Sequence, residues 1–193
     1  MKVGVLISGT GSNLQALIDD GGIEIACVAS NVADAPGLAR ATGAGIPVLA
    51  GANEGETGDF LERHAVGLVV LAGYMRILSP QFVHRFSGRI MNVHPSLLPA
   101  FAGAHAIRDA LAHGVRVTGV TVHLVDNAHV AADSGPIVLQ EALEVSYDDR
   151  PEDVTDRLHE IEHRLLPRAV RLFCAGLIEV DGRKVRVREE RLA

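Results

Sequence analysis

The chain has 193 residues, of which 48% are apolar and 22% charged, and its formal net charge is −6. This length suits one domain with a substantial core, and the composition excludes an intrinsically disordered chain. The negative charge, without a long basic run, gives no general attraction to nucleic acid. An anionic ligand would therefore need a local trap, either a helix N-terminus or a few basic side chains.

The sequence shows no pattern typical of export or membrane insertion. The apolar run after Lys2 is too short for a signal peptide and meets a glycine turn at once. No stretch approaches the roughly 20 apolar residues of a membrane span. Two cysteines, Cys27 and Cys174, are too few for a disulfide framework, and we interpret them as buried, reduced thiols. We therefore expect a soluble, cytoplasmic protein that does not contact a membrane.

The first 90 residues alternate short apolar strands with helical patterns. Helices are predicted to begin near Asn13, Ala35, Thr57 and Ser79, the last with Pro80 in its first turn. Buried parallel strands are predicted over 2–7, 23–30, 46–49 and 66–73, and a further strand over 88–94. This alternation predicts an α/β fold with a doubly wound, mostly parallel sheet. In such a fold, ligands bind at the carboxyl ends of the strands.

The second half of the chain changes character. A helix over 105–114 is followed by two strands of the same sheet, predicted over 116–126 and 135–145. A long amphipathic helix is predicted over 151–176, because its apolar residues step by three and four. Pro167 inside it predicts a local kink. The tail predicts a terminal hairpin around Asp181–Gly182.

The glycine turn after the first strand is typical of a phosphate site. The turn at 9–11 lacks the third glycine of a dinucleotide fingerprint, and Ser30–Asn31 stand where an NAD enzyme has an acidic residue. No Gly-Lys-Ser/Thr follows, so it is not a Walker A loop. Gly11, Ser12 and Asn13 at a helix N-terminus suit a phosphate monoester. The alternative is a plain tight turn in which Asn13 caps the helix.

The stretch HEIEH, residues 159–163, matches the H-E-x-x-H zinc signature. Two histidines one helical turn apart share a face and can bind zinc together. No third-ligand motif follows, and the α/β pattern is not that of a zinc protease. We therefore expect no metal here and interpret the segment as the polar flank of a helix, facing solvent or a ligand.

The densest polar stretch follows the fifth strand. Asn92 and His94 are two residues apart, so both side chains leave one face of the strand. Pro95 favours an extended His94 and ends the strand there. An amide donor beside a titratable imidazole suits the stabilisation of an oxyanion and proton transfer. The alternative is a strand-end histidine that bonds only to backbone.

Asp133 precedes a Ser-Gly-Pro turn that leads into the last long strand. A carboxylate arriving near His94 would orient the imidazole and favour its charged form. The alternative for Asp133 is a turn-capping residue. Asp126 is the competing acid for the same place.

Five segments together resemble the folate-dependent phosphoribosylglycinamide formyltransferases. They are LISGTGSNLQALID (6–19), LAGYMRILSP (71–80), MNVHPSLLPAF (91–101), VTGVTVHLVD (117–126) and DSGPIVLQ (133–140). The resemblance implies one Rossmann-like formyltransferase domain over 1–193, with a phosphate-binding half (1–90) and a folate and catalytic half (91–193). It implies formyl transfer from 10-formyltetrahydrofolate, a co-substrate, to the amine of glycinamide ribonucleotide in purine biosynthesis, without a metal.

The resemblance also implies roles for particular residues. Asn92 and protonated His94 would stabilise the oxyanion, while Asp133 would support His94 and help move a proton from the amine to N10. The ribotide would contact Gly11, Ser12, Asn13, Pro95, His159 and Glu162. The folate would contact Met75, Arg76, Ile77, Leu78, Asn92, His105 and Val125, with Arg76 near its glutamate tail. The partners would be small molecules, with a homodimer as one option for assembly.

Three segments depart from the family pattern, and several rivals stay open. The stretch from His123 to Asp133 is about three residues longer, and 50–60 is shorter and more acidic. Ala102 and Ala104 stand where the family commonly has proline or another residue and a larger apolar residue. Rivals with the same chemistry are a formyltetrahydrofolate hydrolase and a methionyl-tRNA formyltransferase, whose extra domains would not fit in 193 residues. From another class, a nucleotide-binding or regulatory relative without catalysis is the alternative.

Overall fold

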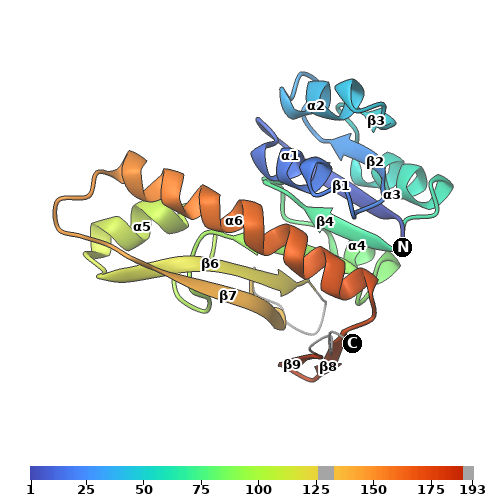
Figure 1. Cartoon of the computed structure of the whole chain (residues 1–193). Helices are drawn as coiled ribbons and strands as arrows, with labels where there is room; N and C mark the ends of the chain where they lie inside the picture. Colours follow the sequence, from blue (N-terminus) through green and yellow to red (C-terminus); the bar gives the residue numbers. More distant parts are fainter. Residues whose placement is uncertain (126–132, 189–193) are drawn as a thin grey trace.

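In the computed structural model, which describes residues 1–125 and 133–188, a seven-stranded sheet runs through the molecule (Figure 1). Its order is β3-β2-β1-β4-β5-β6-β7. The strands are β1 (Val3–Ile7), β2 (Ile25–Ser30), β3 (Val48–Leu49), β4 (Leu68–Leu71), β5 (Ile90–His94), β6 (Val117–Leu124) and β7 (Ile137–Glu144). The first five are parallel, and β6 and β7 are antiparallel to their neighbours. The predicted mostly parallel α/β sheet is thus confirmed, with all seven strands present.

Burial of the strands follows their place in the sheet. Every residue of β1 and of β4 is buried, because helices cover both faces of these central strands. The prediction that 46–49 forms a buried strand was wrong: β3 is two residues long at the sheet edge, and Val48 is exposed. The chain order reverses between β1 and β4, which makes the carboxyl ends of these strands the expected ligand crevice.

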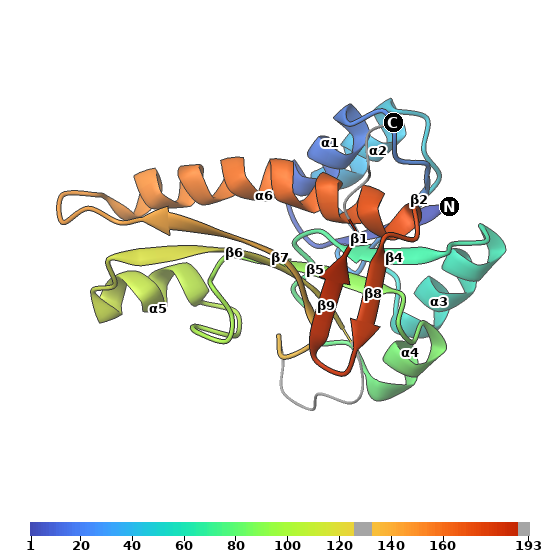
Figure 2. The ribbon, with the colours of Figure 1, turned by 60° about the horizontal axis from the view of Figure 1, so that its bottom comes forward.

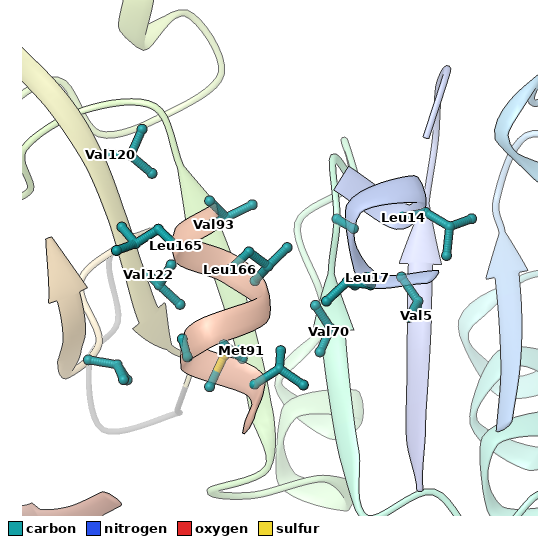
Figure 3. Close-up of a cluster of buried hydrophobic side chains, with 14 of the residues drawn as sticks. Val5, Leu14, Leu17, Val70, Met91, Val93, Val120, Val122, Leu165 and Leu166 are labelled. Carbon is teal, nitrogen blue, oxygen red and sulfur yellow. The ribbon is translucent and has the colours of Figure 1, made fainter. Parts of the chain in front are cut away.

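Within the described ranges, six helices flank the sheet: α1 (Ser12–Asp19), α2 (Gly37–Gly43), α3 (Glu54–Arg63), α4 (Pro80–Arg85), α5 (Ala106–His113) and α6 (Pro151–Cys174). Figure 2 shows α1, α2 and α6 on one side of the sheet, and α3 and α4 on the other. Leu165 and Leu166 of α6 pack among buried side chains of β5 and β6, while Leu14 and Leu17 of α1 cover β1 and β4 (Figure 3). Each such side chain contributes about 1.5–3 kcal/mol on burial.

One helix begins before its predicted start, for an identifiable reason. The start of α3 is three residues before Thr57, because Asn53 caps the helix and forms a capping box with Glu56. The start of α2 at Gly37 lies two residues after Ala35, near which it was predicted. The start of α4 is as predicted, since Ser79 accepts a hydrogen bond from Phe82 N–H and Pro80 opens the helix.

The C-terminal region agrees with the predicted long helix and hairpin. Helix α6 continues through Pro167, and the hairpin pairs β8 (Ile178–Asp181) with β9 (Lys184–Val187). Cys27 is a buried free thiol as expected, but Cys174 is only half-buried, because it lies at the exposed end of α6. Among the residues described, no helix is long and apolar enough to span a membrane.

Candidate functional site

Loops from three neighbouring strands meet at the point where the strand order reverses. Ser8, directly after β1, donates its backbone N–H to Gly73 O (3.1 Å) at the end of β4. Its hydroxyl donates to Asn31 Oδ1 (2.6 Å) after β2 and accepts from the N–H of Met75 (2.9 Å). Ser8 therefore ties the loop that begins at Met75 to the glycine turn. Sequence reasoning gave Ser8 no role.

The glycine turn has the backbone that a phosphate site needs. Gly11 precedes α1 with a left-handed φ of 72°, and a Cβ there would lie 2.8 Å from Gly37 Cα, so only glycine fits. The first helical bond runs from Gln15 N to Gly11 O. The N–H groups of Ser12, Asn13 and Leu14 therefore have no acceptor within the helix and remain available to an anion.

Asn13 does not cap α1, so the alternative of a plain capped turn was wrong. The N-terminus of α1 has no side-chain cap, and Asn13 Nδ2 instead donates to Glu162 Oε2 of α6 (2.8 Å). Both residues are buried, with 7% and 5% of their surface exposed. Asn13 Oδ1 has no hydrogen-bond partner among the described residues. Asn13 and Glu162, both predicted to contact the ribotide, thus contact each other although they are 149 residues apart in the chain.

Asn92, His94 and Asp133 lie together. His94 Nδ1 is 3.5 Å from Asp133 Oδ2, and Asn92 Nδ2 donates to Asp133 Oδ1 at 3.3 Å. His94 is 5% exposed, so its imidazole is largely removed from solvent. The predicted shared face of Asn92 and His94 is confirmed, as is the arrival of Asp133 beside His94. Asp126, the competing acid, lies outside the described residues.

The position of Asp133 depends on a close backbone approach. A Cβ on Gly135 would lie 1.8 Å from Leu124 O, so only glycine lets the chain enter β7 directly beside the end of β6. Asp133 itself has a left-handed φ of 55° and accepts a hydrogen bond from Gly103 N–H at 2.9 Å. The backbone conformation of the Asp-Ser-Gly-Pro segment therefore places the Asp133 carboxylate beside His94.

The environment of Asp133 holds it in its charged form. Burial alone would raise the pKa of this carboxyl group. The polar interaction with the His123 ring, the charge of His94 and the N–H of Gly103 outweigh burial and lower the pKa of Asp133 to about 2. Asp133 is thus a carboxylate at any pH near neutrality.

His123 belongs to the same cluster, and sequence reasoning missed it. Its Nε2 lies 3.1 Å from Asn92 Nδ2 and 3.6 Å from Asp133 Oδ1, and its Nδ1 faces the Leu124 carbonyl at 3.0 Å. His123 pairs directly with Asn92 across the antiparallel strands. The alternation in VTVHL (120–124) could have found it, because it places Thr121 and His123 on one face of β6. Asn92 and His94 share a face of the neighbouring β5 in the same way.

A polar network fixes the loop after β5. Thr121 Oγ1 donates to Ser96 O (2.7 Å) and accepts from Leu98 N–H (3.1 Å). Gln140 of β7 donates to Thr121 Oγ1 at 2.8 Å. The loop then returns to the cluster, because the Phe101 carbonyl lies 2.9 Å from His94 Nε2. Both nitrogens of His94 thus face acceptors, and an imidazolium satisfies both.

The other residues predicted to contact the folate, and Pro95, which is predicted to contact the ribotide, differ in exposure. Met75, Arg76 and Ile77 are exposed, with Ile77 at 85%, and Leu78 is half-buried. Val125 is half-buried beside β5, where its N–H donates to Ile90 O. Pro95 directly follows His94 and is half-buried. His105 is exposed at the start of α5, and its ring makes no hydrogen bond within the described part of the chain.

The HEIEH segment lies on α6 beside the glycine turn. Its glutamate, Glu162, is engaged by Asn13, while the rings of His159 and His163 stack with centroids 6.1 Å apart. No group of three or more His, Cys, Asp or Glu side chains placed to hold a metal occurs in 1–125 and 133–188. The segment therefore faces the glycine turn through Glu162.

Known proteins are similar to this chain in sequence and in fold. A family model described as formyl transferase matches residues 1–170. Trifunctional purine biosynthetic protein adenosine-3 from Gallus gallus is 45% identical over 194 residues, and the match covers 93% of this chain but 19% of that protein. This chain thus spans about a fifth of that relative.

Two relatives match over most of their own length. Phosphoribosylglycinamide formyltransferase from Haemophilus influenzae is 42% identical over 193 residues, covering 93% of this chain and 90% of that enzyme. The crystal structure of glycinamide ribonucleotide transformylase 1 from Symbiobacterium toebii superposes with a TM-score of 0.91 at 43% identity, covering 98% of this chain and 94% of that one. The chain belongs to the formyl transferase family.

Proposed function

We propose that this chain transfers a formyl group from 10-formyltetrahydrofolate to the amine of glycinamide ribonucleotide. The observation that carries the proposal is the cluster in which Asp133 contacts the half-buried Asn92 and the buried His94 of β5. Relatives that match along 90% or more of their own length are named for this reaction, which supports the same substrates here.

The ribotide is proposed to lie along the N-terminus of α1. Its phosphate would accept hydrogen bonds from the N–H groups of Gly11, Ser12 and Asn13, and its hydroxyls would donate to Glu162 and to the unpartnered Asn13 Oδ1. Each hydroxyl has one O–H to donate, so two hydroxyls of the ribotide would complement one buried carboxylate and one buried amide oxygen. His159 and Pro95 would flank this ligand.

The proposed reaction begins when the ribotide amine attacks the formyl carbon. Asn92 would donate a hydrogen bond to the oxyanion that forms, and His94, as an imidazolium, would donate to it from Nδ1 in place of the 3.5 Å contact with Asp133. The formyl oxygen would replace Asp133 Oδ1 as the acceptor of the hydrogen bond from Asn92 Nδ2. At 3.3 Å this bond is longer than the 3.1 Å contact of the same nitrogen with His123 Nε2. The C–N10 bond then breaks and a proton moves from the amine to N10, which leaves tetrahydrofolate and the N-formyl ribotide.

The folate is proposed to bind against the loop from Met75 to Leu78, with Arg76 near the glutamate tail. It is a co-substrate, and none of the proposed steps uses a metal ion. All the residues given roles come from one chain, so the proposal needs no second copy. It includes a cytoplasmic location, which fits the free thiols of Cys27 and Cys174.

A spectrophotometric assay tests this proposal. Purified protein is mixed with 10-formyl-5,8-dideazafolate, with and without glycinamide ribonucleotide, and release of the deformylated folate is followed. A transferase releases it only when the ribotide is present. Release at the same rate without ribotide would identify a hydrolase instead, and no release in either case would identify a relative without catalysis.

A further inference from the structure

Arg40 of α2 lies against the glycine turn and forms hydrogen bonds to residues on both sides of Gly11. Its Nε donates to Thr10 O at 2.8 Å, and its Nη1 donates to Gln15 Oε1 at 3.2 Å. Thr10 precedes Gly11, and Gln15 lies in the first turn of α1, so the guanidinium spans the segment whose N–H groups are open. Sequence reasoning did not single out this residue.

The backbone brings α2 close enough for this contact. Gly37 N–H donates to Gly9 O at 3.0 Å. A Cβ on Gly37 would lie 3.0 Å from Gly11 Cα, and a Cβ on Gly11 would lie 3.5 Å from Arg40 Cδ. Glycine at both positions therefore lets the arginine side chain run directly beside Gly11.

The charge of Arg40 is not neutralised by the described residues. The two other arginines that line the same groove between α1 and α6 are paired, Arg164 with Glu141 and Arg171 with Asp20. Arg40 has no carboxylate within ion-pair distance in the described ranges, and its Nη2 makes no hydrogen bond there. The groove has a volume of about 680 Å³, and Ser12 and His163 also line it.

We propose that Arg40 binds the phosphate of the substrate and supplies the positive charge that the backbone N–H groups lack. The inference rests on the proposed ribotide substrate. Two bonds to the turn hold the planar guanidinium in place, so little side-chain entropy is lost when Nη2 meets a phosphate oxygen. In a chain with net charge −6, such a local cation offsets the general repulsion of a phosphate.

The test compares two substrates that differ only in the phosphate. Wild type and Arg40→Gln are assayed with glycinamide ribonucleotide and with the phosphate-free glycinamide riboside. Loss of a charge-assisted bond should lower kcat/KM for the ribotide about 10- to 100-fold. The riboside value should change less than about twofold, because that substrate has no phosphate to lose. Arg40→Lys should recover part of the ribotide value.

Arg63→Gln is the matched control, because it removes the same charge from the exposed end of α3 on the other side of the sheet. It should leave both substrates unaffected. An equal loss for both substrates in Arg40→Gln would mean that Arg40 only shapes the turn, and no loss for either would remove it from the site. Both results overturn the proposal.

Calorimetric binding of ribose 5-phosphate separates this proposal from the proposed function. Arg40→Gln should weaken that binding whether or not the protein catalyses formyl transfer. Unchanged binding in the variant would overturn the role of Arg40. Failure of wild type to formylate the ribotide would instead overturn the proposed function alone.

Discussion

At the scale of single residues, alternation along a strand carried most of the information about the site. Asn92 and His94 could be placed on one face from their spacing alone. Their partners could not, because Asp133 reaches them only through the backbone approach at Gly135, and His123 only through the antiparallel register of β6. Both of these depend on which strands become neighbours, and local sequence does not specify this.

His94→Ala should lower kcat by two orders of magnitude or more, because oxyanion stabilisation and proton transfer each contribute about 10²-fold or more. Steady-state kinetics with both substrates measures this. Asn92→Ala should also lose about 10²–10³-fold, as expected for one oxyanion donor. His84→Ala on the exposed surface of α4 is the control and should keep its turnover. Near wild-type turnover in His94→Ala would remove His94 from the mechanism.

Asp133→Asn should lower kcat across the whole assay range. The pKa of Asp133 is lowered to about 2, so its negative charge is present throughout this range and lies 3.5 Å from His94 Nδ1. An amide carries no charge at any pH, so the variant lacks this charge at every pH tested, whereas protonation of Asp133 should slow the wild type only as the pH falls toward 2. Measurement of kcat between about pH 5 and 9 checks this, and an unchanged kcat would show that the charge of Asp133 does not contribute to turnover.

At the scale of elements, local sequence signals determine where helices begin, and tertiary contacts determine which partners their side chains bind. Ser79 and Pro80 predicted the start of α4 correctly. The start of α3 was placed at Thr57, although the Asn53–Glu56 capping box was present in the sequence. Asparagine is a common helix cap, but Asn13 donates to the buried carboxylate of Glu162 instead. That carboxylate belongs to α6, 149 residues along the chain, so local sequence could not reveal the contact.

Ser8→Ala should weaken folate binding more than ribotide binding. The hydroxyl holds the N–H of Met75, and Asn31 fixes the direction of its proton, so its removal frees the loop that would contact the folate. A lost hydrogen bond of this kind corresponds to roughly a 2- to 10-fold rise in the folate KM.

Ser8→Thr, which keeps the hydroxyl, should recover part of the Ser8→Ala loss, and Ser87→Ala on the exposed loop after α4 is the neutral control. Equal rises in the folate KM and the ribotide KM in Ser8→Ala would contradict a role in positioning the Met75 loop.

At the scale of the whole molecule, the alternation of strands and helices predicted the α/β sheet and its seven strands. It did not predict the order of the strands, and that order makes the carboxyl ends of β1 and β4 adjacent, at the place where a doubly wound fold binds its ligands. It also did not predict that the edge strand β3 is short and exposed, because burial depends on what lies beside a strand. The site therefore emerges from the topology, while its chemistry is already readable in the sequence.

A labelled transfer tests the central claim most directly. Protein in excess is mixed with folate carrying a ¹³C-formyl group and with glycinamide ribonucleotide, and the products of a single turnover are identified by mass spectrometry. The account predicts that the label appears in the N-formyl ribotide with wild type, and that His94→Ala forms this product at least about 10²-fold more slowly. Label recovered as formate, or a ribotide product formed equally fast by His94→Ala, would contradict it.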